Sequence, residues 1–516
     1  MGLDLNLIAP DLSLAWPQVI VFVTAIVLLF ADAFIPRAIH FTTLTAISLV
    51  GYIGAAFALF TQHGQNASTF SGAFRADGLT VFLSLTILVA AIATVMISAS
   101  YLQNGEQVPG PNGELRIANR MPAGEFYVLI AFSVFGSMLV ASAGNLIVLY
   151  IGIELSALAT YVLTAFAKRR LTSVEGAMKY FLLGLFASGI LLYGLAWIYG
   201  VTGSMDFDQI AFHLSRTGAG DGLGDPALLL GVLLLVVGIG FKMAAVPFHF
   251  WTPDAYDGAP TPVTAYMSVV PKAAAFAAAV RLFVQALEPL TDDWAVIWAV
   301  LAVITMAFGN IVAIAQRNVK RMLAYSSIAH TGYIMVGLAA YTRGGPIQDQ
   351  AVSSLLFYLL AYTFMNIGAF AVVTWLQQRG MGMTLDDFNG LASTKPLVAF
   401  AMTIFMASLM GIPPLLGFYA KYYVIVAAID ADLLWLAVSV VVASAVSAFF
   451  YLRIVAVMYF NQADGAPRAV PTGMLSAGIG VLAVATLLLG LFSSPIIDLA
   501  DAWSSAQTFL PEAAGR

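Results

Sequence analysis

The sequence contains no cysteine and few charged residues, and both shortages narrow the class of protein. Without cysteine among its 516 residues, the chain can form no disulfide, thiolate metal site, cysteine-ligated iron–sulfur cluster or catalytic thiol. Charged residues make up only 9% of the chain, against about 25% in a typical soluble domain. No block of basic residues indicates a nucleic-acid surface, and the five scattered histidines lack metal-ligand spacing. Glycine-rich nucleotide loops and the HExxH zinc motif are absent as well.

Apolar residues, in contrast, are plentiful and grouped. They make up 61% of the chain, and the mean hydropathy of +0.91 is too high for a water-soluble core to hide them all. Apolar runs of about 20 residues, the length that spans the hydrocarbon of a bilayer, recur from residue 15 to residue 493. We count fourteen of them, including 262–283, 321–341 and 396–428. The sequence therefore predicts an all-α, polytopic membrane protein of about fourteen transmembrane helices.

The distribution of basic residues predicts an orientation. Short loops that face the cytoplasm carry more Lys and Arg than loops that face outside. With the N-terminus outside, 13 of the 22 basic residues fall on the inner side of the predicted spans and 5, including Arg281, on the outer side. An even number of spans then places both termini in the periplasm or an equivalent outer compartment.

The remaining four basic residues are lysines inside predicted spans, where one glutamate also lies. An ionisable side chain near the bilayer centre costs about 2.5–3.5 kcal/mol on insertion scales, so it usually marks function or a buried pair. Glu154 and Lys272 lie centrally in their spans, far from the interface. Lys179 lies only a few residues inside its span and can extend to the interface, so a structural role fits it nearly as well.

The other two lysines lie beside prolines. Pro247 follows Lys242 by five residues, and Pro413 and Pro414 precede Lys421. Because proline removes a helical hydrogen bond and clashes with the preceding turn, both helices are predicted to break within the membrane. A simple kink with a paired lysine is the structural alternative. The two breaks fall at corresponding places of two five-helix blocks, a pattern typical of the inverted repeats of secondary transporters.

Together these residues predict a proton relay. Desolvation disfavours the charged form of an amine and a nearby carboxylate favours it, so a buried lysine can gain or lose a proton with modest changes of pairing or hydration. We expect Glu154 to modulate Lys179 or Lys242. Lys242 and Lys272 then pass the proton along a hydrated line, and Lys421 releases it.

Two histidines are weaker candidates for a secondary relay. His249 lies two residues after Pro247, and His330 lies within a later span. Imidazole titrates near neutral pH, so either ring could bridge a polar gap between lysines. A hydrogen-bonded structural histidine fits the sequence equally well.

Several segments of the chain resemble a known family. The segment GFKMAAVPFHFWTPDAYDGAPTPVTAYMSVVPKAAAF closely resembles the signature of the antiporter-like membrane subunits of respiratory complex I, and three further segments are similar to that family: YIGIELSALATYVL, QRNVKRMLAYSSIAHTGYIMVG and GIPPLLGFYAKYY. These matches cover about residues 124–460. The form WTPDAYDGAPTPV is similar to subunit N, the counterpart of mitochondrial subunit 2, rather than to subunits L or M. Subunit L is expected to be longer, and subunit M carries a glutamate where this chain has Lys421.

This resemblance implies an organisation and a function. It implies three N-terminal helices in residues 1–123, antiporter-like five-helix repeats in 124–283 and 294–460, and a last helix with a tail in 461–516. The family's proton-channel positions correspond to Glu154, Lys179, Lys242, Lys272 and Lys421. The chain would then be part of a translocase in the bacterial inner membrane, the proton-translocating NADH:quinone oxidoreductase. It would bind no cofactor itself, because flavin, iron–sulfur clusters and quinone belong to partner subunits. The expected neighbours are the antiporter-like subunit M and the small subunits K and J.

Three other functions remain open at this point. A subunit of a multisubunit Na⁺/H⁺ antiporter would share the fold and similar lysines. A homologous subunit of a complex that takes electrons from ferredoxin or a deazaflavin would look the same, because the electron donor binds elsewhere. A structural spacer that holds pumping subunits apart would keep the charges for assembly alone.

Overall fold

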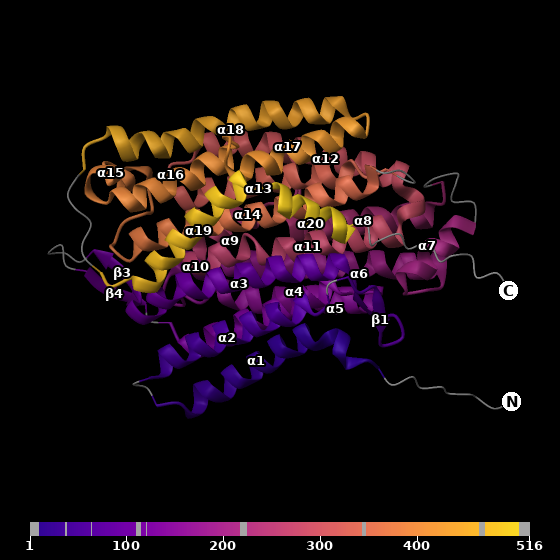
Figure 1. Ribbon diagram of the computed structural model, residues 1–516, viewed down its shortest axis with the longest axis horizontal. Helices are drawn as coiled ribbons and strands as arrows, with labels where there is room; N and C mark the ends of the chain where they lie inside the picture. Colours follow the sequence, from indigo (N-terminus) through magenta and orange to yellow (C-terminus); the bar gives the residue numbers. More distant parts are fainter. Residues whose placement is uncertain are drawn as a thin grey trace.

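Long helices form almost the whole of the structure, a computed structural model that describes residues 10–36, 39–62, 64–109, 115–119, 121–216, 224–342, 347–463 and 470–504. In Figure 1 most of these helices lie side by side along one direction, with α1 and α2 at one edge of the bundle and α18 at the opposite edge. The prediction of an all-α membrane protein is confirmed. The predicted positions of the two termini fall on residues 1–9 and 505–516, outside the described part of the chain.

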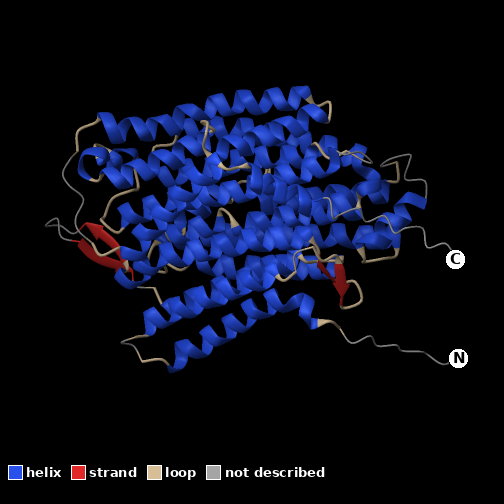
Figure 2. Ribbon diagram, in the orientation of Figure 1, coloured by secondary structure: helices blue, strands red, loops and turns tan. Residues whose placement is uncertain are grey.

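The N-terminal part of the chain contains three long helices and two small hairpins. Its elements are η1 (Leu12–Ala15), α1 (Trp16–Phe34), α2 (His40–Phe60), β1 (Ala67–Thr69), β2 (Phe74–Ala76), α3 (Gly78–Asn104), β3 (Glu106–Pro109) and β4 (Leu115–Asn119). β1 pairs with β2 and β3 with β4, both antiparallel. Each hairpin is therefore a two-stranded sheet in the connection between two successive helices (Figure 2). The apolar periodicity of the spans gave no signal for these short strands.

The middle of the chain contains the first interrupted helix. Its elements are α4 (Ala123–Ala141), α5 (Leu146–Thr164), α6 (Leu171–Thr202), α7 (Phe207–Arg216), α8 (Pro226–Met243), α9 (Thr252–Gly258), α10 (Thr261–Met267), α11 (Val270–Ala279), the π-helical segment η3 (Val280–Ala286) and η4 (Glu288–Leu290). α8 ends where Ala244 adopts a left-handed φ of +67°, and α9 begins only at Thr252. The predicted break near Pro247 is therefore present.

The last part of the chain contains the second interrupted helix. Its elements are α12 (Thr291–Ala315), α13 (Val319–Ala339), α14 (Ile347–Gln377), η5 (Leu385–Phe388), α15 (Leu391–Thr394), α16 (Pro396–Met410), α17 (Leu416–Asp430), α18 (Leu434–Phe460), α19 (Gly473–Leu491) and α20 (Ser494–Ser504). α16 ends where Gly411 has φ +93°, a conformation that glycine adopts readily. The predicted break at Pro413 and Pro414 is also present.

A third interruption was not predicted. The run 262–283 reads as one continuous span, but α10 ends at Met267 and α11 starts at Val270. Pro271 lies in the first turn of α11, directly before Lys272. The proline next to this lysine is the signal that could have predicted the break, because proline cannot extend a helix from the preceding turn.

The number of membrane-crossing helices stays a prediction. Among the described residues, 12 helices are long and apolar enough to cross a membrane. The expected span 321–341 forms α13, which has 21 residues. It is not among the 12 because it carries more polar side chains, which are buried against other helices inside the bundle. The expected span 396–428 forms two helices of 15 residues each, α16 and α17. The internal repeat is likewise untested.

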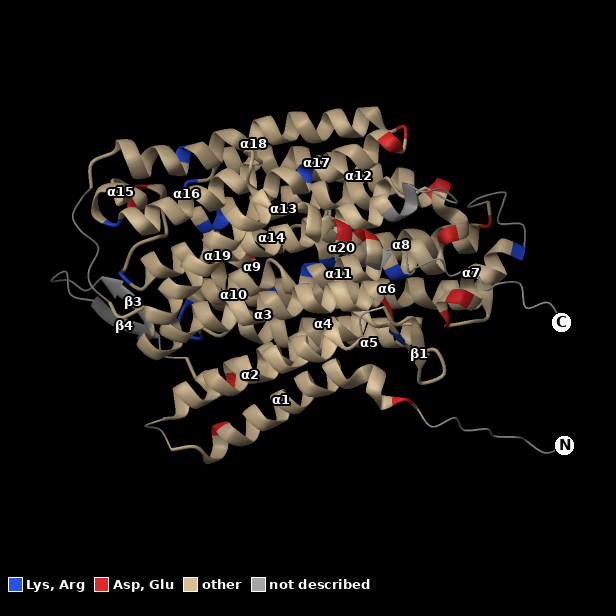
Figure 3. Cartoon of the chain, viewed as in Figure 1, with Lys and Arg blue, Asp and Glu red and all other residues tan. Residues whose placement is uncertain are grey.

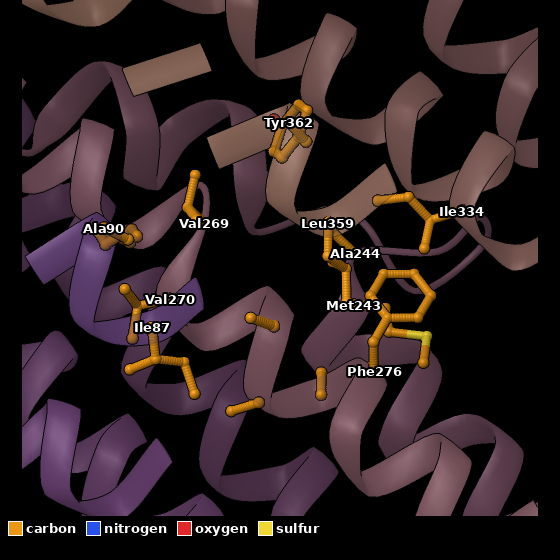
Figure 4. Packing of buried hydrophobic residues seen from close by; sticks show 14 of the residues in the cluster. Ile87, Ala90, Met243, Ala244, Val269, Val270, Phe276, Ile334, Leu359 and Tyr362 are labelled. Atoms are coloured by element: carbon orange, nitrogen blue, oxygen red, sulfur yellow. The ribbon is translucent and has the colours of Figure 1, made fainter. Parts of the chain in front are cut away.

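Part of the buried core lies where the first break meets its neighbours. Met243 and Ala244 at the end of α8 pack near Phe276 of α11, Ile334 of α13 and Leu359 of α14 (Figure 4). Charged residues are sparse along the helices, and a few lie part-way along them rather than at their ends (Figure 3). Residues 261–286 are 94% buried in their most apolar stretch, so the helix that carries Lys272 is enclosed by protein.

One basic residue used for the orientation is placed differently by the structure. Arg281 was expected on the outer side of a span, but its side chain is fully buried and its guanidinium pairs with Asp77 at 2.6 Å. Buried arginines are tolerated when every donor has a partner, and here carbonyl and side-chain oxygens complete the set. Arg281 therefore says nothing about membrane orientation.

Candidate functional site

Lys242 lies at the end of α8 and pairs with the predicted glutamate. Its Nζ is 3.3 Å from Oε1 of Glu154 on α5 and donates to Oγ of Ser188 on α6 at 2.9 Å. Ser188 also donates to Oε1 of Glu154 at 2.5 Å. The side chains of Lys242 and Glu154 are only 9% and 19% exposed. Three helices thus bring an amine, a carboxylate and a hydroxyl into one nearly buried cluster.

Lys179 lies in a different cluster. Its Nζ is 2.7 Å from Oε1 of Glu175, one turn earlier on α6, and 2.8 Å from Oδ2 of Asp254 on α9. Ser188, which touches Glu154, is nine residues further along the same helix, about 13 Å at 1.5 Å per residue. A lysine side chain cannot cover that distance. Of the two expected partners of Glu154, the structure therefore brings only Lys242 to it.

Lys272 is held by hydroxyl and carbonyl groups. Its Nζ donates to the carbonyl oxygen of Ser327 at 2.7 Å, to Oγ of Ser327 at 2.6 Å and to Oγ1 of Thr331 at 2.9 Å. The residue is 1% exposed, and the described partners of its amine are hydroxyl and carbonyl oxygens. Tyr362 of α14 donates to the same Ser327 hydroxyl at 2.8 Å. Three uncharged oxygens therefore satisfy the three donors of this buried amine.

Thr331 joins the first break to Lys272. Its Oγ1 lies within donating distance of two carbonyl oxygens, that of Met243 at 2.9 Å and that of Ser327, one turn earlier on its own helix, at 3.1 Å; the Met243 carbonyl ends α8 directly after Lys242. The same hydroxyl accepts from Lys272. A carbonyl freed by the interruption thus finds a partner in α13, as a buried backbone group must. One hydroxyl therefore links the helix end of Lys242 to the amine of Lys272.

Replacing Thr331 with valine, which keeps the shape and removes the hydroxyl, is expected to slow proton uptake by the assembled complex about five-fold or more. The change leaves the Met243 carbonyl and one Lys272 N–H without their partner, and unpaired buried groups are unfavourable. The measurement is NADH-driven proton uptake in membrane vesicles. Thr363→Val is the matched control, because Thr363 is equally buried and, within the described part of the chain, its hydroxyl bonds to the Leu359 carbonyl of its own helix alone. Equal rates for the two variants would contradict this role of Thr331.

Lys421 lies at the second break. Its Nζ donates to the carbonyl oxygen of Met410, the last residue of α16, at 2.9 Å and to Oγ of Ser444 on α18 at 2.8 Å. The amine also lies 4.8 Å from the ring centre of Tyr333. A Cβ added at Gly411 would come within 3.1 Å of the Lys421 side chain. The break therefore supplies both a freed carbonyl for the amine and the space that the side chain occupies.

His330 lies on α13 between the Lys272 and Lys421 groups. Its Nδ1 is 2.9 Å from the hydroxyl of Tyr358, and its Nε2 is 3.1 Å from the hydroxyl of Tyr451. Tyr358 in turn stacks on Tyr333, which contacts Lys421. Because both ring nitrogens have hydroxyl partners, a proton can arrive at one nitrogen while another leaves from the opposite one.

His249 does not join this group. It lies in the first break, with its ring 4.5 Å from the ring of Phe308 on α12. Its Nδ1 has no hydrogen-bond partner among the residues that the structure describes. The ring packs against aromatic side chains rather than against any of the lysines.

The structure thus brings Glu154 and Lys242 together, connects them to Lys272 through one threonine and places His330 toward Lys421. The hydroxyl partners were missed by sequence reasoning, because serine, threonine and tyrosine occur throughout the helices and only tertiary contacts single them out: Ser188, Ser327, Thr331, Tyr358, Tyr362, Ser444 and Tyr451. Asp254 was also missed, although it stands in the quoted segment WTPDAYDGAPTPV. Among the described residues, no group of three or more His, Asp or Glu could hold a metal ion.

Comparisons with known proteins show the family and the fold of this chain. The family described as "NADH:quinone oxidoreductase/Mrp antiporter, TM" matches residues 143–447. A chain in the structure of respiratory complex I from Thermus thermophilus with bound aureothin is 32% identical, with a TM-score of 0.76 over 94% of this chain and 99% of that one. A chain of the Mrp complex from Dietzia sp. reaches a TM-score of 0.80 over 96% of this chain and 97% of that one, but at 23% identity it shares the fold alone. Interrupted helices with buried lysines thus define an antiporter-like membrane subunit.

The curated relatives narrow this class. NADH-quinone oxidoreductase subunit N of Trichlorobacter lovleyi is 42% identical over 95% of this chain and 96% of its own length. The same subunit of Parvibaculum lavamentivorans is 40% identical over 95% of this chain and 96% of its own length. The chain belongs to the NADH-quinone oxidoreductase subunit N family.

Proposed function

We propose that this chain carries protons across the bacterial inner membrane as a membrane-arm subunit of the proton-translocating NADH:quinone oxidoreductase. Protons move along Glu154, Lys242, Lys272 and Lys421, with His330 between the last two. The redox reaction takes place in partner subunits and drives this movement. Lys179 and His249, which lie apart from this line, have no transfer step in the proposal.

One observation carries the proposal: three buried amines each lie at an interruption of a helix, and the threonine hydroxyl that accepts from the second amine also reaches the backbone carbonyl of Met243, the residue after Lys242. Lys242 precedes the break at Ala244, Lys272 follows the one at Ser268, and Lys421 follows the one at Gly411. Interrupted helices expose backbone groups that hydrogen-bond to ions and water inside a membrane. An amine at such a place can exchange its proton without leaving the protein interior.

The energies involved are compatible with switching. Moving one proton through a potential of 100 mV requires about 2.3 kcal/mol. Forming or losing a single carboxylate partner changes the affinity of a buried amine for its proton by a comparable amount. The contact between Lys242 and Glu154, at 3.3 Å, is long enough to shorten or open. The proposed relay residues can therefore take up and release protons with only small changes in their pairing.

The partners follow from the family rather than from this chain. A sequence without cysteine offers no thiolate for an iron–sulfur cluster, so we assign the clusters to partner subunits. The family resemblance assigns flavin and quinone to partner subunits as well. We propose the antiporter-like subunit M and the small subunits K and J as neighbours, and a periplasmic position for both termini. We also retain the division into residues 1–123, 124–283, 294–460 and 461–516, with the two middle parts as inverted repeats.

Isolation of the tagged chain tests this function against the Na⁺/H⁺ antiporter. The proposal expects the chain to copurify with flavin- and cluster-bearing proteins that oxidise NADH, and the isolated complex in vesicles to take up protons when NADH is added. Sodium-driven proton movement without NADH, from a preparation that lacks flavin, would contradict it. A spacer role would show as unchanged proton movement after the buried charges are neutralised in an assembled complex.

A further inference from the structure

Asp254 on α9 is shared between two cations from distant parts of the chain. Its Oδ2 is 2.8 Å from Nζ of Lys179 on α6, and its Oδ1 is 3.0 Å from Nη1 of Arg321 on α13. α6 belongs to the first proposed repeat and α13 to the second. One carboxylate therefore connects the second half of the broken helix to both repeats at once.

The C-terminal end of α9 is held by cations from the same two parts. Lys320 of α13 donates to the carbonyl oxygens of Ala259 at 2.7 Å and Asp257 at 3.1 Å. Arg170, just before α6, donates to the carbonyl of Asp257 at 3.2 Å and to that of Gly258. Cations stabilise the negative end of a helix, where carbonyls lack intrahelical partners. The position of this short helix is thus set by α6 on one side and α13 on the other.

The N-terminal end of α9 continues the contact with α6. The ring of Trp251 stacks on that of Tyr180 at 4.2 Å, next to Lys179, and its Nε1 donates to the carbonyl of Phe241 at 3.1 Å. Phe241 directly precedes Lys242. A displacement of α9 would therefore reach the helix end that carries Lys242 and the Met243 carbonyl.

We infer that Asp254 is a positioning residue that ties α9, and through it the alignment of Lys242 with Lys272, to both halves of the chain. The inference rests on the proposed proton-carrying role of those lysines. Asp254 itself touches neither of them. In these two ion pairs the side chain of Asp254 is 30% exposed, that of Lys179 is 44% exposed and that of Arg321 is 34% exposed. Exposed ion pairs add little to stability. Their loss should shift α9 without unfolding the chain.

The absence of cysteine makes the shift measurable. Phe248→Cys places a thiol within the break, between Lys242 and Asp254, and it is the only thiol of this chain. The assembled complex is treated with N-ethylmaleimide, and the alkylated peptide of this chain is quantified by mass spectrometry. In this background Asp254→Asn is expected to change the alkylation rate about five-fold and to reduce NADH-driven proton uptake by a similar factor. Asp254→Glu, which keeps the charge, should restore more than half of both.

Asp257→Asn is the matched control. Asp257 lies on the same helix, but its carboxylate is 3.8 Å from Arg321 and bonds to Asn318, so its loss should leave alkylation and proton uptake near the parent values. Unchanged alkylation in Asp254→Asn, or equal changes in both variants, would overturn the inference. If Asp254→Asn fails to assemble, Lys179→Gln and Arg321→Gln each decide the matter, because each should alter alkylation. The alkylation rate does not depend on proton pumping, so the two hypotheses fail separately. Normal pumping by Lys242→Met would refute the proposed function, but the alkylation result would still decide whether Asp254 positions α9.

Discussion

A complex whose copy of this chain carries Lys242→Met is expected to assemble normally and to lose most of its NADH-driven proton uptake. Methionine is close to lysine in length and apolar, so it fills the site without the titratable amine. Proton transfer by a positioned side chain typically contributes about 10²–10⁴-fold to a rate, and we expect a fall of at least about ten-fold. NADH oxidation should fall with it, because the two processes are coupled.

The pairing of Lys242 explains why the variant should still assemble. Glu154 loses its cation but keeps the hydrogen bond from Ser188 at 2.5 Å, and its side chain is 19% exposed. A carboxylate with a remaining donor and some access to solvent is tolerated better than one sealed in apolar surroundings. Assembly is checked by native electrophoresis of the membranes. Lys168→Met is the control, because Lys168 is exposed in the loop before α6, and it should leave proton uptake unchanged.

Loss of Asp77 is expected to have the largest effect on stability. Asp77 and Arg281 are both fully buried, and the guanidinium makes two bonds to the carboxylate, at 2.6 and 2.8 Å. The remaining donors of Arg281 reach Ala141, Thr80 and Gln285. Asp77→Ala leaves the guanidinium charge buried without its partner, which typically destabilises by roughly 3–5 kcal/mol. The effect is measured by thermal unfolding of the purified complex, with release of this subunit from the complex as the readout.

The same pair gives a pH dependence. Burial opposes the charge of Asp77, but the guanidinium of Arg281 and the hydrogen bonds to the carboxylate outweigh it and hold the pKa of Asp77 below its usual value. Its contribution to stability is therefore complete above about pH 4, the value for an unfolded aspartate, and is lost as the pH falls through the lower folded value.

Asp32→Asn is the control for Asp77→Ala, because Asp32 is 37% exposed in its pair with His40. Similar stability losses for the two aspartate variants would contradict the assigned role.

Local chemistry explains what the sequence could predict. Pro247, Pro413 and Pro414 act on the turn beside them, so two of the three breaks could be placed without any tertiary information. The break before Lys272 was missed because the surrounding run is mostly apolar, and the single Pro271 was read as part of a continuous helix. Charges inside apolar runs were also visible as exceptional residues, which identified the lysines and Glu154.

Pairing between distant residues could not be predicted in the same way. Lys179 and Asp254 are 75 residues apart, and nothing local distinguishes Asp254 from Glu154 as the partner of Lys179. Arg281 stands near the end of a predicted span, where a loop position and a buried pair with Asp77 look alike in sequence. The hydroxyls around Lys272 and His330 are common residues whose roles depend on which helices adjoin. Contacts of this kind are fixed by packing, not by periodicity.

The most direct test of the central claim, that buried amines at helix breaks carry the protons, is the proton flux per assembled complex. It is measured with NADH oxidation in the same vesicles, for the parent complex, Lys242→Met and Lys168→Met. The account predicts a flux at least about ten-fold lower for Lys242→Met alone. Equal fluxes from the three complexes, at equal assembly, would contradict it.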